Sequence, residues 1–140
     1  SLEVTSSGSL HGIEIDMADM SDLVPTLAVV AVFADSPTRI TGVGFIRQKE
    51  SDRIGDLVNG LKMVGCDAVE EDDGILIRPV HESQMHGAEL LTHDDHRLAM
   101  AWSLLALRIS GIVIDDPEVV SKSWPEWWDV RSSLLVVAAK

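Results

Sequence analysis

The stretch RQKESDRIGDLVNGLKMVG, from Arg47 to Gly65, sets a pattern that recurs along this chain. Apolar side chains recur at helical spacing between residues 54 and 64, and Gly65 is a typical residue at a helix C-terminus. Two cations, Lys49 and Arg53, lie one turn apart at the start of this predicted helix. Like charges at this spacing repel each other and face the positive end of the helix dipole, so local stability does not account for them.

The elements on either side of that helix complete a first unit. Residues 2–16 read as two short strands about a Ser/Gly turn. An apolar helix is predicted from Ser21 to about Ala34, and a strand from Arg39 to Val43. Residues 66–80 predict a hairpin with its turn at Asp73-Gly74. The helix that ends near Ala34 is apolar nearly all round, which predicts burial between layers.

The same order of elements returns in the second half. A long apolar helix is predicted from about Asp95 to Ile109 and a strand from Ile112 to Ile114. A second helix is predicted in SKSWPEWWDVRSSL, residues 121–134, with Pro125 in its first turn. The chain therefore contains an imperfect repeat of βαβα units. This predicts an α/β fold with parallel pairing inside each unit, and one domain over residues 1–140.

The repeat places unusual polar side chains at the starts of four predicted helices. Asp22 and the pair His96-Arg97 mark the first helices of the two units, and Lys49 and Lys122 mark the second helices. If the units pack side by side, these helix ends converge on one face. The polar side chains would then form one site.

Two interpretations of Lys49 and Arg53 remain open on spacing alone. An anion at the helix N-terminus would make both cations favourable, because the free backbone N–H groups and the two charges would act together. The alternative is a solvated turn in which Glu50 and Asp52 neutralise the cations.

Other polar motifs have an ordinary interpretation beside a functional one. HDDHR, residues 93–97, has two histidines three apart with carboxylates between them, as a metal site would, but no further ligand set is evident. Asp22 is typical of a helix N-cap or first-turn acid. The tryptophans of WPEWW, residues 124–128, are typical of core or interface anchors. No phosphate-binding glycine motif and no nucleophile elbow occurs in the sequence.

Composition excludes some classes of partner. The 140 residues carry a net charge of −12, which argues against nucleic-acid and membrane-surface binding. The longest apolar run, residues 23–34, is too short to span a bilayer. The single Cys66 permits no internal disulfide, fits a reducing compartment and is expected to be a buried small hydrophobe. The sequence begins without Met, as a cut or truncated chain does.

Four segments together identify a family. They are DMADMSDLVPTLAVVAVFA, RQKESDRIGDLVNGLKMVG, DDHRLAMAWSLLAL and SKSWPEWWD. In this order and spacing they strongly resemble the C-terminal part of the 5-enolpyruvylshikimate-3-phosphate synthases, and the resemblance covers roughly residues 12–130. It implies repeated βαβαββ units that make up most of one of two domains, with substrates bound between the domains at helix N-termini.

The resemblance also implies a reaction. These enzymes transfer the enolpyruvyl group of phosphoenolpyruvate to the 5-hydroxyl of shikimate 3-phosphate and release phosphate, a cytoplasmic step toward aromatic amino acids and the target of glyphosate. No cofactor or metal is implied. The reaction passes through a tetrahedral adduct that carries carboxylate and phosphate, so fixed cations lower the cost of bringing two polyanions together.

Residue roles follow from the matching motifs, as what the resemblance implies. Asp22 would contact the shikimate ring hydroxyls and act as base toward the attacking hydroxyl, and Glu50 would transfer a proton at the enolpyruvyl carbon. The remaining residues would bind the two substrates: Lys49 the shikimate 3-phosphate, and Arg53, His96, Arg97 and Lys122 the phosphoenolpyruvate.

Two departures from the family pattern qualify this expectation. Phe45 stands where some relatives have a polar residue that contacts the sugar-like substrate. The family's N-terminal domain, with its own lysine, serine and arginine ligands, is absent, so this chain alone is expected to have little or no activity. The alternatives are a related transferase that acts on a UDP-sugar and a non-catalytic phosphate-binding or assembly fragment.

Overall fold

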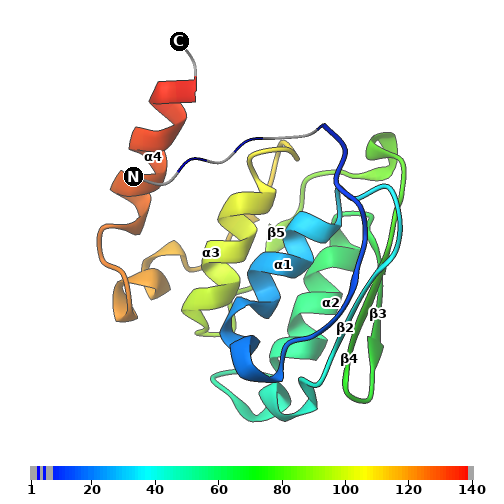
Figure 1. Ribbon diagram of the computed structural model, residues 1–140. Helices are drawn as coiled ribbons and strands as arrows, with labels where there is room; N and C mark the ends of the chain where they lie inside the picture. The colour runs from blue at the N-terminus through cyan, green and yellow to red at the C-terminus, as the bar shows by residue number, and fades with distance from the viewer. Residues whose placement is uncertain (1–2, 4, 6–7, 139–140) are drawn as a thin grey trace.

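The first half of the chain folds into one complete βαβαββ unit. The structure, a computed structural model, describes residues 3, 5 and 8–138 (Figure 1). Strand β1 (Glu14–Asp16) pairs in parallel with β2 (Thr38–Thr41), as predicted for a strand pair joined through a helix. β2 pairs antiparallel with β4 (Gly74–Arg78), which forms a hairpin with β3 (Asp67–Glu71). The order in the sheet is β1-β2-β4-β3.

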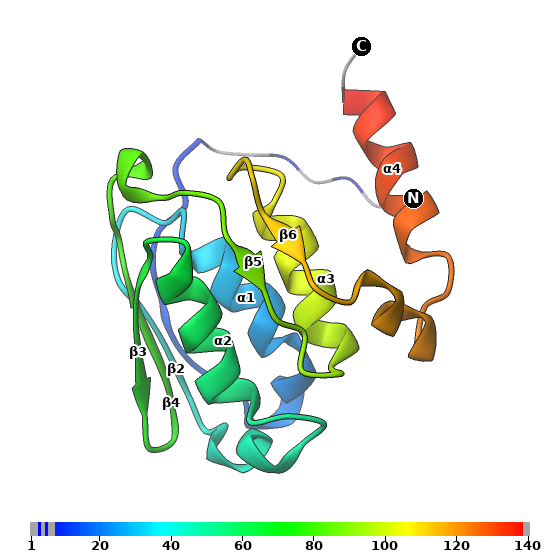
Figure 2. The same ribbon diagram turned by 180° about the vertical axis from the view of Figure 1, so that it is seen from behind.

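The second half repeats the first part of this unit. β5 (Glu89–Leu90) and β6 (Val113–Ile114) form a separate parallel pair, joined through helix α3 (His96–Leu105). Helix α4 (Trp127–Ala138) follows and projects away from the body of the molecule (Figures 1 and 2). The predicted repeat and its parallel pairing are therefore confirmed.

Three helices build the core and lie side by side: α1 (Val24–Ala31), α2 (Arg53–Met63) and α3 (Figures 1 and 2). α2 packs against β3 and β4 of the larger sheet, whereas α3 packs against α1 on the side away from that sheet. Trp102 of α3 has no exposed surface, and its indole nitrogen donates to the Leu91 carbonyl at 3.0 Å. Fully buried leucine, isoleucine and valine side chains from α2 and the sheet surround this centre. Burial of this apolar area is the main favourable contribution to folding.

The described residues contain short 3₁₀ segments: η1 (Ala18–Leu23), η2 (Gly44–Gln48), η3 (Glu82–Gln84) and η4 (Pro117–Lys122). η1, η2 and η4 stand at predicted helix starts, whereas η3 lies where no helix was predicted. The helix predicted across residues 47–65 therefore begins only at Arg53, where Asp52 accepts a hydrogen bond from the Gly55 amide at 3.0 Å and caps it. Lys122 ends η4 and does not open α4, which begins after Pro125. The predicted starts of both second helices were wrong.

Other predicted elements need smaller corrections. Among the described residues before Asp16, only β1 is a strand, and the first of the two strands predicted there lies partly outside the described residues. α1 ends at Ala31, three residues earlier than predicted. Val30 is 40% exposed, so α1 is buried on one side and not all round. The hairpin turn falls at Asp72-Asp73. Cys66 is buried as predicted, and burial raises the pKa of its thiol to about 11.

Candidate functional site

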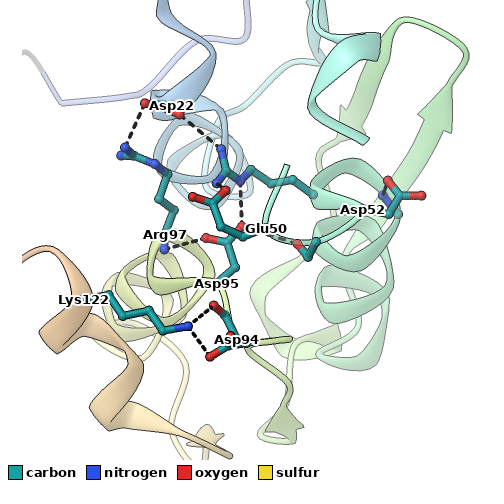
Figure 3. Close-up of polar contacts among 10 residues, drawn as sticks. Asp22, Glu50, Asp52, Asp94, Asp95, Arg97 and Lys122 are labelled. Atoms are coloured by element: carbon teal, nitrogen blue, oxygen red, sulfur yellow. Dashed lines mark hydrogen bonds and ion pairs between the residues drawn. The ribbon is translucent and has the colours of Figure 1, made fainter. Parts of the chain in front are cut away.

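The polar side chains gather where α1, α2 and α3 begin, because these three helices start at the same end of the molecule (Figures 1 and 2). η1 brings Asp22 to this end, just before α1. Its Oδ1 accepts a hydrogen bond from Arg53 Nη1 at 3.2 Å, and its Oδ2 accepts one from Arg97 Nη2 at 2.8 Å (Figure 3). Leu23 is the N-cap of α1, so the N-cap interpretation of Asp22 is wrong. Asp22 instead bridges two guanidinium groups.

Arg53 is the centre of the site and has no exposed surface. Its three nitrogens donate to three different carboxylates: Nε to Asp95 Oδ2 at 2.8 Å, Nη2 to Glu50 Oε2 at 2.6 Å, and Nη1 to Asp22. A buried guanidinium needs such partners, because an unpaired charge in the interior is very costly. Arg53 is therefore not in a solvated turn, although Glu50 does neutralise it as that interpretation expected.

Asp95 joins the helix start to this centre, and its side chain is completely buried. Its Oδ1 accepts a hydrogen bond from the Arg97 amide at 2.9 Å and caps α3, while its Oδ2 holds Arg53. Ser51 Oγ lies 3.4 Å from the same Oδ2. One carboxylate thus fixes both the entry of α3 and the position of the buried arginine.

Arg97 and His96 occupy the first turn of α3. The Arg97 side chain is about one third exposed and reaches Asp22 through Nη2. Its Nε is buried and has no hydrogen-bond partner in the described part of the chain. His96 is buried beside it, with 9% of its surface exposed. Arg97 therefore has donor capacity that the protein itself does not use.

Lys122 approaches the same end from η4. Its ammonium forms an ion pair with the Asp94 carboxylate and donates to the Asp94 carbonyl oxygen at 3.1 Å (Figure 3). Asp94 and His93 have φ values of 60° and 50°, the left-handed region that non-glycine residues rarely adopt. This turn aims the Asp94 carbonyl and carboxylate at one ammonium.

Among the described residues, neither Lys49 nor His96 has a side-chain hydrogen bond or ion pair that joins it to the network. Lys49 lies at the end of η2, outside α2, with its ammonium 5.7 Å from the centre of the Phe45 ring. The like-charge pair expected at the start of one helix is therefore absent, because Lys49 precedes α2 and Arg53 points into the interior. Glu50, which follows Lys49, does belong to the network through Arg53.

A groove of about 340 Å³ runs beside the network. Asp22 and Arg97 form its polar wall, and Met100, Leu104, Trp124 and Trp127 contribute to the rest. Trp127 is held by a hydrogen bond from its indole nitrogen to Ser103 Oγ at 3.2 Å, as expected of an anchor, whereas Trp124 is 42% exposed. Arg97 is thus accessible from one side, whereas Arg53 does not line the groove and has no exposed surface.

The neighbourhood of HDDHR does not form a metal cluster. Among residues 3, 5 and 8–138, no group of three or more His, Cys, Asp or Glu side chains is arranged to hold a metal ion. His93 instead lies 3.5 Å from Asp56 Oδ1. Burial raises the pKa of Asp56, and the nearby His93 and Ser51 oppose that rise.

Two residues of the site were missed from the sequence. Asp94 and Asp95 belong to the quoted DDHR motif, and an aspartate directly before a helix is a recognisable N-cap signal for Asp95. Their contacts with Lys122 and Arg53 join segments 28 and 42 residues apart. Together with the separate Lys122–Asp94 pair, the site opposes three cations with four carboxylates, a combination suited to oxyanion binding and proton transfer.

Comparisons with known proteins are consistent with one another. The family model for EPSP synthase (3-phosphoshikimate 1-carboxyvinyltransferase) matches residues 1–130. A 3-phosphoshikimate 1-carboxyvinyltransferase from Methanosphaerula palustris is 47% identical over 125 residues, and one from Nostoc punctiforme is 44% identical over 126 residues. These matches cover 89% and 90% of this chain but only 29% of each relative.

The fold has a solved counterpart. The structure of EPSP synthase from Acinetobacter baumannii matches 89% of this chain with a TM-score of 0.81 and 35% sequence identity, and the match covers 30% of that chain. The protein described here therefore spans under a third of the length of the relatives it matches. Within its described residues, no helix is long and apolar enough to cross a membrane.

Proposed function

The chain belongs to the EPSP synthase family and has the enolpyruvyl transferase fold, and we propose that it forms part of an enzyme that transfers the enolpyruvyl group of phosphoenolpyruvate to the 5-hydroxyl of shikimate 3-phosphate. Phosphate is the second product. The enzyme would work in the cytoplasm, as a step toward aromatic amino acids, and would be a target of glyphosate.

The observation that carries this proposal is the connected network of Asp22, Glu50, Arg53 and Arg97. Three chain segments, at residues 22, 50–53 and 97, bring these side chains together around one buried guanidinium. Both substrates are anions, and arginine binds carboxylate and phosphate through two parallel hydrogen bonds. A set of arginines with two accessible carboxylates suits a reaction that needs both anion binding and proton transfer.

Each residue has a stated role in the proposal. Asp22 contacts the shikimate ring hydroxyls and takes the proton of the attacking hydroxyl. Glu50, whose side chain is 45% exposed, transfers a proton at the enolpyruvyl carbon. The substrate ligands are Lys49 for shikimate 3-phosphate, and Arg53, His96, Arg97 and Lys122 for phosphoenolpyruvate.

This chain would supply one side of the active site. It forms a single C-terminal domain portion in the proposal, and the other substrate ligands come from an N-terminal domain that it does not contain. Closing a site around two anions requires both sides, since exclusion of water strengthens the charge interactions in the site. The chain alone is therefore expected to have little or no activity.

Complementation tests the proposal. This chain is mixed with a second chain that comprises the part of the Methanosphaerula palustris relative that it does not cover, and phosphate release from phosphoenolpyruvate and shikimate 3-phosphate is measured. The mixture is expected to turn over. Glu50→Gln should lower kcat by about a hundredfold or more, because a positioned general acid or base contributes that much.

Glu71→Gln is the matched control. Glu71 pairs with Arg39 on the outer sheet, so its loss removes the same charge without touching the network. Absence of turnover, with both pieces folded and associated, would contradict the enzymatic role and favour a non-catalytic phosphate-binding fragment. Turnover with a UDP-sugar in place of shikimate 3-phosphate would assign the related cell-wall transferase instead.

A further inference from the structure

We propose that Asp22 is a built-in competitor for the anion site, and that only an oxyanion able to bridge Arg53 and Arg97 displaces it. The proposal rests on the proposed function for the identity of the natural substrates. The competition itself depends only on the contacts of this chain. Asp22 thereby becomes a residue that determines which anions enter the site.

The contacts define what an incoming anion must replace. The two oxygens of Asp22 lie 3.2 Å from Arg53 Nη1 and 2.8 Å from Arg97 Nη2. This is the arrangement that two oxygens of a carboxylate, phosphate or sulfate would adopt between the same guanidinium groups. A single-atom anion such as chloride cannot make both contacts at these positions, so it is a poor replacement.

The two arginines differ in how they can respond. Arg53 keeps Asp95 and Glu50 when Asp22 leaves, so its position is fixed and only Nη1 is released. Arg97 has a buried Nε with no partner among the described residues, next to the Nη2 that Asp22 now holds. Asp22 accepts a hydrogen bond from Nη2 of Arg97 but not from Nε. An oxyanion could accept from both nitrogens together, in the bidentate geometry that guanidinium groups favour.

Displacement has a consequence for the proposed reaction. Both oxygens of Asp22 accept hydrogen bonds from guanidinium groups in the present arrangement, so an incoming hydroxyl has to compete with Arg53 and Arg97 for them. When an anionic substrate takes the bridging position, Asp22 loses both arginines. Its carboxylate then becomes available to the attacking hydroxyl. Binding of the donor anion and release of the base are one coupled event.

Sulfate is the probe for this competition, because its charge does not change near neutral pH. The isolated chain is titrated with sodium sulfate at constant ionic strength, with sodium chloride as balancing salt, and the arginine side-chain and Arg97 amide resonances are followed by NMR. Asp22→Asn should bind sulfate about fivefold or more tightly than the unchanged chain, because two carboxylate–guanidinium contacts no longer oppose binding. An amide cannot bridge two donors, since one of its ends is itself a donor.

Three further variants separate the bridge from a general charge effect. Asp67→Asn changes the net charge equally, but Asp67, on β3, pairs with Arg78 of β4, so sulfate affinity should not change. Glu50→Gln removes a carboxylate that contacts Arg53 only, and its gain should be clearly smaller. Adding Arg97→Lys to Asp22→Asn should remove the gain, because an ammonium lacks the guanidinium fork.

The proposal has definite contrary results. It is overturned if Asp22→Asn leaves sulfate affinity unchanged, if Glu50→Gln gives an equal gain, or if chloride competes as well as sulfate. Asp22→Ser, which also removes the bridging carboxylate, replaces Asp22→Asn if that variant unfolds. Sulfate binding is measured without turnover, so failure of the complementation assay and failure of this proposal are separate results.

Discussion

Arg53 is a charged side chain without exposed surface, so its effect on stability depends on its ion pairs. Arg53→Ala leaves the fully buried Asp95 without its cation. The expected loss in the free energy of unfolding is about 3–5 kcal/mol, the usual cost of an uncompensated buried charge. Urea denaturation followed by circular dichroism measures it.

Arg39→Ala is the control for this substitution. Arg39 pairs with Glu71 on the exposed face of the sheet, and its side chain is 44% exposed. Solvent weakens such a pair, so the loss should stay within about 1 kcal/mol. Equal losses of stability in the two variants would show that the burial of Arg53 and Asp95 does not raise the cost of breaking their ion pair.

The sequence predicted which residues gather at the site better than it predicted the hydrogen bonds between them. The candidate site residues were predicted from four motifs, and the structure joins Asp22, Glu50, Arg53 and Arg97 in one network. The bridge by Asp22 could not be predicted, because it depends on contacts 31 and 75 residues apart. Lys49 was misplaced for a local reason: η2 ends there, and a cap at Asp52 starts the helix later.

Helices α2 and α3 approach each other closely at one glycine. A Cβ added to Gly60 would lie 2.6 Å from two ring carbons of Trp102, a side chain without exposed surface. Gly60→Ala is therefore expected to lower the free energy of unfolding by about 1–3 kcal/mol through overpacking. Helix propensity alone predicts the opposite change in the free energy of unfolding, because it favours alanine over glycine by about 1 kcal/mol.

Asn59→Ala provides the comparison on the same helix. Asn59 is exposed, so alanine there should leave stability unchanged or raise it slightly. Thermal denaturation of the two variants side by side measures the difference. A stabilised Gly60→Ala chain would mean that Trp102 moves away easily and that the two helices are not held by this contact.

Element types followed from the sequence, whereas element ends often did not. Periodicity predicted α1, α2, α3 and the hairpin because each buries one apolar face on the core. The ends depend on backbone hydrogen bonds and caps that periodicity does not encode, which is why η4 was taken for the start of α4. The convergence of helix starts was predictable from the repeat, since equivalent units present equivalent ends.

The whole molecule carries a net charge of −12 on 140 residues, although its site binds anions in our proposal. Arg53, Arg97 and Lys122 each form an ion pair with a carboxylate, so the site adds no net positive charge. Long-range repulsion between carboxylates destabilises a compact chain of this charge, while surface ion pairs oppose that effect only weakly. The two contributions respond to salt in opposite directions.

Stability is accordingly expected to rise with ionic strength. Raising the NaCl concentration from about 20 to about 300 mM shortens the Debye length from roughly 20 Å to roughly 6 Å. This should raise the free energy of unfolding in urea by about 0.5 kcal/mol or more, because screening relieves the net repulsion. Sodium chloride is preferred to sulfate, which also strengthens hydrophobic burial and would bind the proposed site.

Charge reversal checks the cause of this salt effect. Glu126 and Asp72 are exposed and lie outside the ion pairs of the site. Changing both to lysine alters the net charge by two units each, from −12 to about −8, so the gain in stability from salt should shrink. A chain that lost stability with added NaCl would show that ion pairs such as Arg39–Glu71 and Arg78–Asp67 outweigh the net charge, and the repulsion argument would be wrong.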